Sequence, residues 1–298
     1  MPVAIFTHPD CLLHNQGPAH PEAPARLAAV LARLATEPAA QVITADCATE
    51  EPLLAVHPSS HLRLLERMSA AGGGVIDADT SLNGASWHAA LGGAGAVLAA
   101  VAHAHAGRGH AFAAVRPPGH HAAADTAMGF CLFNNVVIAA RAAQRLGRAR
   151  ILIVDWDVHH GNGTQALVEQ DPSVRFVSMH QWPWWPGSGA ETERGVGNIF
   201  NLPRPGGLAP ERYVADLWST TELATEGWRP DLVLISAGFD AMRGDPLGGF
   251  TLEPEHFAEL TTRLRERFLD VPLVGLLEGG YIPARLAEGV AAHVRALA

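Results

Sequence analysis

Two aspartates and a histidine stand where they could bind one divalent cation. Asp157 and His159 lie two residues apart just after the apolar run Ile151–Val154, and Asp240 follows a second run, Leu232–Ser236. In extended backbone, residues i and i+2 point to the same side, so Asp157 and His159 can reach one ion. Two carboxylates and an imidazole with room for water are typical of catalytic zinc. The alternative is that each side chain only caps the helix that follows it.

Two adjacent histidines, His120 and His121, follow the sequence RPPG. Imidazoles beside a metal site can carry protons during hydrolysis. Each ring needs a partner for its second nitrogen, and Asp155 and Asn162 stand close to the metal-binding residues in the sequence. The alternative is that one of the pair is a buried, hydrogen-bonded structural histidine.

Aromatic residues follow other apolar runs. Tyr281 comes after two glycines, where its phenol could donate a hydrogen bond to a developing oxyanion, unless it only packs on the sheet rim. Trp182, Trp184 and Trp185 gather on a proline-rich loop. Such aromatics often line a pocket, but a hydrophobic plug under the loop explains Trp182 and Trp184 equally well.

The cysteines Cys11, Cys47 and Cys131 are widely spaced and form no CxxC pair. Neither a disulfide framework nor a cysteine-based zinc site is therefore expected. Cys131 is interpreted as a small buried apolar residue. Several histidines are interpreted as ordinary surface or core residues: His8, His14, His57, His61, His88, His103, His105, His110 and His256.

Composition limits the class of protein. The 298 residues are 48% hydrophobic and 17% charged, which excludes a disordered chain. The net charge of −9 and the absence of a Lys or Arg run argue against nucleic-acid binding. No signal peptide is apparent, and the uncharged run Ala85–Gly107 is too rich in Ala and Gly for a membrane span, so it predicts a buried helix. We expect a cytoplasmic protein without a membrane partner, and the sequence leaves homo-oligomerisation open.

Apolar runs alternate with helical patterns along the chain. Strands are predicted at Val3–Phe6, Ala111–Val115, Ile151–Val154, Val174–Ser178, Asn198–Leu202, Leu232–Ser236 and Leu273–Leu277. Helices are predicted at Pro24–Ala35, Ser59–Ala71, Ser86–Ala106, Asn134–Leu146, Pro210–Glu226, Pro254–Phe268 and Pro283–Leu297. This alternation predicts a parallel sheet covered on both faces, whose ligands bind at the carboxyl ends of the strands. Because no repeat or linker interrupts it, residues 1–298 are expected to form one α/β domain.

Five ordered motifs resemble the histone deacetylase family of the arginase/deacetylase superfamily: RPPGHH, GFCLFNN, DWDVHHGNGTQ, SAGFDAMRGDPLGG and LEGGY. The similarity extends over most of the chain, from Val3 to Leu286, and DWDVHHGNGTQ and GDPLGG are similar to the class II branch. The resemblance implies a single α/β domain with a central eight-stranded parallel sheet flanked by helices. It also implies a zinc-dependent amidohydrolase that removes acetyl or other acyl groups from lysine side chains.

The resemblance also implies the residues of the catalytic centre. One zinc ion per chain would be bound by Asp157, His159 and Asp240. The catalytic residues would be His120, His121, Tyr281, Asp155 and Asn162. In this scheme His121 is the general base and then the general acid, His120 assists electrostatically, and Tyr281 polarises the amide carbonyl.

Further positions follow from the same resemblance. The substrate-binding residues would be Gly129, Phe130, Trp185, Leu247 and, at the rim, Asp79. Trp185 stands where the family usually has Phe or Tyr, and Arg26 would line an inner channel. A structural potassium ion would involve Asp155, Asp157, His159, Ser178 and Met179.

Other functions compete with lysine deacylation. Arginase-type enzymes with two manganese ions need an aspartate where this chain has Gly161, four residues after Asp157. A non-catalytic acyl-lysine binder should lack a ligand or the tyrosine, and neither is missing. Acetylpolyamines or other small acylated amines remain alternative substrates to acyl-lysine proteins and peptides. Leu247 favours acyl-lysine, because polyamine-selective relatives tend to carry an acidic residue there.

Overall fold

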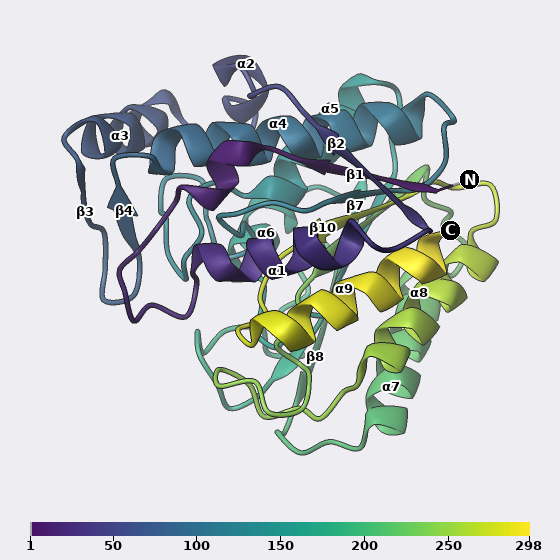
Figure 1. The fold of residues 1–298 in the computed structure, drawn as a ribbon. Coiled ribbons are helices and arrows are strands. Elements are labelled where there is room, and N and C mark those ends of the chain that lie inside the picture. The colour runs from purple at the N-terminus through teal and green to yellow at the C-terminus, as the bar shows by residue number, and fades with distance from the viewer. Residues whose placement is uncertain (1) are drawn as a thin grey trace.

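A parallel sheet of eight strands forms the centre of the protein (Figure 1). The computed structural model describes residues 2–298. The strands lie in the order β2-β1-β5-β10-β9-β6-β7-β8. Their bounds are β1 Val3–Thr7, β2 Ala40–Thr44, β5 Ala111–Ala113, β6 Ile151–Asp155, β7 Val174–Gln181, β8 Ile199–Arg204, β9 Leu232–Ala237 and β10 Leu273–Leu277. A separate antiparallel hairpin pairs β3 (Gly73–Val75) with β4 (Ser81–Asn83).

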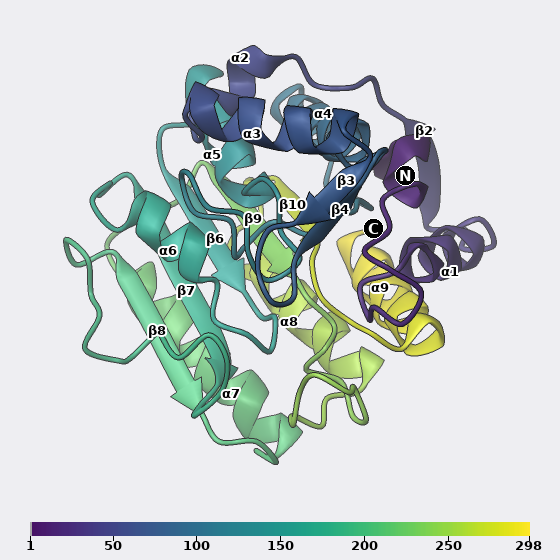
Figure 2. The same cartoon turned by 90° about the vertical axis from the view of Figure 1, so that its left-hand side faces the viewer.

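Helices cover both faces of this sheet. On one face lie α4 (Ser86–His105), α5 (Asn135–Arg145) and α6 (Asn162–Val168). On the other face lie α1 (Pro24–Leu34), α7 (Pro210–Ala224), α8 (Pro254–Arg267) and α9 (Pro283–Leu297). The remaining helices are α2 (Glu50–Leu53), α3 (Ser59–Ala70) and the 3-10 helix η1 (Pro9–Leu12). Figure 2 shows β2 and β8 at opposite edges of the sheet. The α/β fold class with an eight-stranded parallel sheet is thus confirmed.

The central strands are apolar along their whole length because helices bury them from both sides. Every residue of β6, β9 and β10 is buried. Proline occupies the first turn of α1, α7, α8 and α9, where its missing N–H costs no hydrogen bond. These two signals explain why most predicted elements begin within a residue or two of the observed ones.

The helix α4 is the buried helix expected from the uncharged run Ala85–Gly107. It is long and apolar enough to cross a membrane by length and composition alone, but 67% of its most apolar window is buried inside the protein. It packs on β1, β5 and β10. Its apolar character is therefore explained by the core of this domain.

The sequence did not predict every element. Strand β2 was missed because it lies at the sheet edge, where its side chains are half-buried or exposed and form no apolar run. The short elements α2, α6, β3 and β4 were missed as well, since they span only three to seven residues. The predicted strand Ala111–Val115 ends earlier, at Ala113, and β7 continues past Ser178 to Gln181.

A fully buried carboxylate, Glu22, joins the segment before α1 to the segment after β5. Its oxygens accept hydrogen bonds from Arg116 Nη2 at 2.7 Å and from Arg26 Nη1 at 2.9 Å. Burial opposes the charge of Glu22, but Arg116 and Arg26 outweigh it and lower the pKa of Glu22 to about 2. Arg26 also donates to the carbonyls of Glu278 at 2.5 Å and Gly280 at 2.6 Å, so this network supports the segment after β10.

We expect Glu22→Gln to lower the free energy of unfolding by about 3–5 kcal/mol at pH 7, because two buried guanidinium groups lose their counter-charge. Since the pKa of Glu22 is depressed on folding, its contribution is complete above about pH 4.5 and is lost as the pH falls toward 2. Urea unfolding of both proteins from pH 7 downward measures this, with the exposed Glu255→Gln as control. If the difference in unfolding free energy between the wild type and Glu22→Gln stays constant from pH 7 to pH 2, the charge assigned to Glu22 is contradicted.

Candidate active site

Asp157, His159 and Asp240 come together at the carboxyl ends of β6 and β9. One donor atom of each residue lies within 4.8 Å of the others, and all three residues are buried. His159 Nδ1 lies 3.0 Å from Asp157 Oδ1 and 3.3 Å from Asp240 Oδ2. Because β6 and β9 are parallel neighbours, the residues that follow them emerge side by side. The structure therefore brings together the three residues that the sequence proposed as metal ligands.

The surroundings of this cluster fit a divalent cation. Asp240 Oδ2 is buried and has no hydrogen-bond partner among the described residues. A Cβ on Gly238 would lie 2.1 Å from Asp157 Oδ2, and one on Gly279 would lie 2.1 Å from Asp240 Oδ2. The backbone N–H of Gly279 donates to Asp157 Oδ2 at 2.9 Å, and that of Val158 donates to Asp240 Oδ1 at 2.8 Å. The glycines thus allow the backbone to cradle both carboxylates and leave one oxygen free for an ion.

The ionisation of the cluster also points to a cation. Burial raises the pKa of Asp240 to about 7, and the neighbouring charge of Asp157 acts in the same direction. Burial opposes a charge on His159, but the hydrogen bond to Asp157 and the nearby carboxylate of Asp240 outweigh it and raise the pKa of His159 to about 10. A proton on His159 thus occupies the place that a metal ion would take, and the two compete.

His120 and His121 lie beside the cluster, with ring centroids 3.9 Å apart. His120 Nδ1 lies 3.0 Å from Asp155 Oδ2, and His121 Nδ1 lies 2.7 Å from Asn162 Oδ1. The amide nitrogen of Asn162 faces Met128 Sδ at 3.4 Å, which leaves the amide oxygen for His121. An amide oxygen only accepts, so His121 carries its hydrogen on Nδ1 and presents Nε2 as an acceptor.

The pKa values of the two histidines are shifted in opposite directions. Burial opposes a charge on His120, but Asp157 and Asp155 outweigh it and raise the pKa of His120 well above its ordinary value. Burial lowers the pKa of His121 well below its ordinary value, and the charges of His120 and His159 add to this effect. These shifts favour the charged form of His120 and the neutral form of His121.

A cavity of about 210 Å³ opens above these groups. It is lined by Asp79, His121, Gly129, Phe130, His159, Trp184, Trp185, Leu247 and Tyr281. The ring of Trp185 stands edge-on to His121 at 4.6 Å, and Phe130 stands edge-on to Tyr281 at 5.8 Å. The structure thus gathers at one cavity every residue that the sequence proposed for substrate binding, and adds Trp184.

Tyr281 is held at the cavity by its backbone and its ring. Its N–H donates to Asp245 Oδ2 at 2.7 Å, and Asp245 Oδ1 also accepts from the N–H of Leu247 at 3.0 Å. The guanidinium carbon of Arg26 lies 4.9 Å from the centre of the Tyr281 ring. Burial raises the pKa of the Tyr281 phenol well above its ordinary value, so the hydroxyl remains a donor.

Thr80 and His20 lie at the rim and were not singled out by the sequence. Phe130 adopts a positive φ of 69°, and its N–H donates to Thr80 Oγ1 at 3.0 Å. The Thr80 hydroxyl donates to Asp79 Oδ1 at 2.9 Å, while His20 stands edge-on to Phe130 at 4.6 Å. Asp79 is therefore connected to the cavity wall through Thr80, in a loop whose sequence carries no clear pattern.

Glu278 is a buried carboxyl group to which the sequence gave no role. Its Oε2 accepts hydrogen bonds from the N–H groups of Gly119 at 2.7 Å and His120 at 3.2 Å, and its Oε1 has no partner among the described residues. Burial raises the pKa of Glu278 to about 7. Its position directly after β10, within LEGGY, is the signal that could have identified it as a support for the two histidines.

Comparisons with known proteins agree with this geometry. The family model of the histone deacetylase domain matches residues 20–297. The chain is 38% identical over 274 residues to the histone deacetylase-like amidohydrolase of Pseudomonas aeruginosa, covering 89% of this chain and 72% of that protein. The crystal structure of the HDA15 HD domain has a TM-score of 0.95 and 37% identity, covering 99% of this chain and 88% of that one. The crystal structure of the acetylpolyamine aminohydrolase from Burkholderia pseudomallei has a TM-score of 0.90 and 28% identity, covering 99% of this chain and 98% of that one.

We expect one tightly bound zinc ion per chain after dialysis, and its loss in Asp157→Ala and Asp240→Ala, because each removes a carboxylate ligand. A chelator should remove the ion, and Zn²⁺ or Co²⁺ should replace it. Elemental analysis measures this, with Asp270→Ala, whose side chain is 93% exposed, as control. If the wild type holds two ions per chain and Asp240→Ala loses both, the centre does not bind a single metal ion.

Proposed function

Because this chain belongs to the histone deacetylase family, we propose that it is a zinc-dependent amidohydrolase that removes acetyl or other acyl groups from lysine side chains of proteins or peptides. The observation that carries this proposal is the buried Asp157–His159–Asp240 cluster beside the adjacent rings of His120 and His121, at the base of a largely aromatic cavity. In this proposal residues 1–298 form one catalytic domain.

The zinc ion would be held by Asp157, His159 and Asp240. When bound there, zinc supplies polarisation of the amide carbonyl and activation of a water molecule. The unpartnered Asp240 oxygen supports this assignment, because a buried carboxylate oxygen needs a compensating partner. The glycines that cradle both carboxylates support it as well.

His121 is the proposed general base. Its Nδ1–H is held by Asn162, so Nε2 is free to take a proton from the attacking water and to return it to the leaving lysine amine. Its lowered pKa keeps it neutral at pH 7. His120 stays charged beside Asp155 and would stabilise negative charge that develops on the substrate.

Tyr281 would donate a hydrogen bond to the carbonyl oxygen as it gains negative charge. Its raised pKa favours the protonated phenol that this role requires. Asp245 and Arg26 fix its backbone and ring before the substrate arrives, which limits the reorganisation needed during the reaction.

The lining of the cavity suits the aliphatic chain of an acylated lysine. A Cβ on Gly129 would lie 2.5 Å from His121 Cδ2 and 2.6 Å from Trp185 Cη2, so the wall has no room for a side chain there. Phe130 and Trp185 would enclose the methylene groups of lysine. Asp79, at the rim, would accept an N–H of the substrate backbone.

Acylated polyamines or other small acyl amines are the second candidate substrates, and the similarity to the Burkholderia aminohydrolase favours them. A panel of acetyl-lysine peptides, acetylspermidine and small acyl amides, with zinc present, separates the candidates by acetate release. Turnover of the peptides supports lysine deacylation. Faster turnover of acetylspermidine than of every peptide would contradict it, and peptide binding without turnover of any substrate would indicate a non-catalytic binder.

A structural potassium ion is also proposed beneath the zinc, involving Asp155, Asp157, His159, Ser178 and Met179. Asp155 pairs in register with a serine on each neighbouring strand, Ser178 on β7 and Ser236 on β9. The hydroxyl of Ser236 is buried and has no partner among the described residues. We further propose a cytoplasmic location and no nucleic-acid partner, in keeping with the net charge of −9.

Tyr281→Phe removes one hydroxyl and little volume, so zinc content and folding should be preserved. The loss of an oxyanion donor should lower kcat by roughly 10²–10³-fold. Steady-state assays with an acetyl-lysine peptide measure this. The matched control is Tyr213→Phe, which removes the hydrogen bond from the other tyrosine, to the carbonyl of Trp156 at 3.2 Å. A kcat near that of the wild type, with full zinc, would show that Tyr281 is only a rim residue.

Leu247 should favour peptides over polyamines, because an apolar rim residue offers no ion pair to a second ammonium group. We expect kcat/KM for an acetyl-lysine peptide to exceed that for acetylspermidine by about tenfold, since a charge contact contributes roughly 1–3 kcal/mol. Leu247→Glu should narrow or reverse this ratio, while the uncharged Leu247→Gln should not. An unchanged ratio in Leu247→Glu would remove Leu247 from the determinants of specificity.

A further inference from the structure

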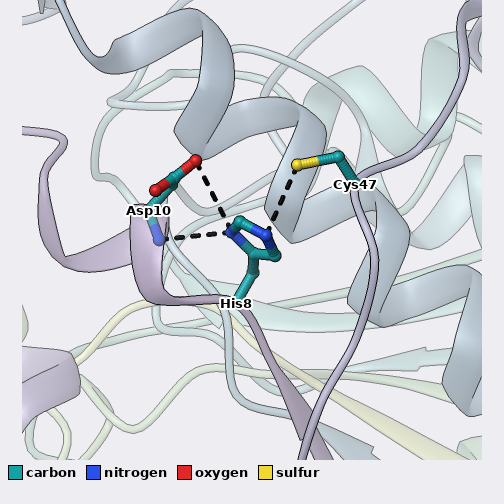
Figure 3. A group of neighbouring side chains, drawn as sticks. All are labelled: His8, Asp10 and Cys47. Atoms are coloured by element: carbon teal, nitrogen blue, oxygen red, sulfur yellow. Dashed lines mark hydrogen bonds and ion pairs between the residues drawn. The ribbon is translucent and has the colours of Figure 1, made fainter.

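A second group of metal-ligating side chains lies where β1 and β2 end, outside the cavity of the proposed active site (Figure 3). His8 directly follows β1, Asp10 lies in η1, and Cys47 lies in the loop after β2. One donor atom from each residue lies within 4.8 Å of the others. Three side chains that can bind a metal ion, from two segments, therefore converge at this edge of the sheet.

The spacing of the two strongest donors fits a zinc ion. Cys47 Sγ lies 3.5 Å from His8 Nε2. Bonds of about 2.3 Å to sulfur and about 2.0–2.1 Å to nitrogen, meeting at a tetrahedral angle, separate the two ligand atoms by about 3.5 Å. Asp10 Oδ2 lies 3.7 Å from His8 Nδ1, and its side chain is 31% exposed. Because it faces Nδ1 and not Nε2, the carboxylate would supply a third ligand after a rotation of its side chain.

Helix α4 holds the two segments in place. A Cβ on Gly92 would lie 2.6 Å from His8 Nδ1, and one on Gly95 would lie 1.9 Å from the carbonyl oxygen of Asp46. Glycine weakens a helix interior, so these positions serve the close approach of the segments that carry His8 and Cys47. The imidazole is further fixed because its Nδ1 accepts the N–H of Asp10 at 3.2 Å.

The local charge favours a cation over a free thiolate. The carboxylates of Asp10 and Asp46 both act electrostatically on Cys47. A divalent ion is attracted by the same carboxylates, and its charge stabilises the thiolate that binds it.

We propose that His8, Asp10 and Cys47 form a second metal site, which takes a zinc-class divalent ion with water in the fourth position. Thiolate and imidazole ligands select zinc and its neighbours over Mg²⁺ or Ca²⁺. Binding displaces the thiol proton of Cys47. The neutral imidazole moves its hydrogen from Nε2 to Nδ1 and gives up the hydrogen bond from the Asp10 N–H, so one proton is released per ion. Because these ligands are partly exposed whereas Asp157, His159 and Asp240 are buried, we expect the active site to fill first. The ion joins the end of β1 to the loop after β2.

Cobalt titration tests the proposal directly. The full chain is loaded with one equivalent of Zn²⁺, kept reduced with a phosphine, and titrated with Co²⁺. The proposed active site holds no cysteine, so a thiolate-to-cobalt charge-transfer band reports on the second site alone. We expect the band in the wild type and its absence in Cys47→Ser. Asp10→Asn and His8→Ala should weaken cobalt binding by about tenfold or more, while the exposed control His105→Ala should match the wild type.

Alkylation with iodoacetamide gives an independent readout. Cys47 is exposed, whereas Cys11 and Cys131 are buried, so Cys47 reacts first. Zinc at ten times its dissociation constant should slow the alkylation of Cys47 about tenfold, because only the unbound fraction reacts. Deacylase activity should be unchanged in Cys47→Ser, which keeps this test separate from that of the proposed function.

Several results would overturn the second site. One is the absence of a thiolate–cobalt band, and another is a band that persists in Cys47→Ser. Alkylation of Cys47 at the same rate with and without zinc would also contradict it. Failure of the deacylase assay would leave these readouts unaffected, so the two proposals can fail separately.

Discussion

The site depends on how several buried carboxyl groups are accommodated at the carboxyl ends of the central strands β6, β9 and β10. Asp155, Asp157, Asp240 and Glu278 are all at most 1% exposed and lie close to one another. Like charges at such a place are unstable unless each finds a partner. Asp155 is paired with His120. Asp157 accepts hydrogen bonds from the Gly279 N–H and the His159 ring. Glu278 accepts hydrogen bonds from two backbone N–H groups. Asp240 keeps one oxygen without a hydrogen-bond partner among the described residues. That oxygen marks the place where a cation would balance the negative charge.

The division of labour between the two histidines follows from the same charges. His120 stands against the carboxylates and is pulled toward the charged form, whereas His121 faces an amide oxygen and an aromatic wall. Opposite pKa shifts therefore act on two rings whose centroids lie 3.9 Å apart. The cavity reaches only His121 of this pair, so the neutral base is the ring that a substrate and its water would meet. The carboxylates at the ends of the central strands thus influence which of the two histidines can act as the base.

Much of this arrangement could be predicted because it depends on strand ends. The carboxyl ends of parallel strands share an edge, so the sequence alone predicts that Asp157, His159 and Asp240 meet. Helix α9 has the predicted bounds, since its proline start and apolar stripe are local signals. The role of Glu278 could not be predicted, because its partners are backbone N–H groups from a distant segment. The meeting of His8 with Cys47 could not be predicted either, because it depends on the pairing of β1 with the edge strand β2, which has no apolar run.

The central claim is that a single metal ion at the edge of the sheet makes this chain an amidohydrolase. It is tested most directly by adding zinc stepwise to metal-free protein while measuring acetate release from an acetyl-lysine peptide. The account predicts activity that rises in proportion to zinc up to one equivalent per chain and gains nothing from a second equivalent. Activity that needs two equivalents, or that is present at full strength without zinc, would contradict it.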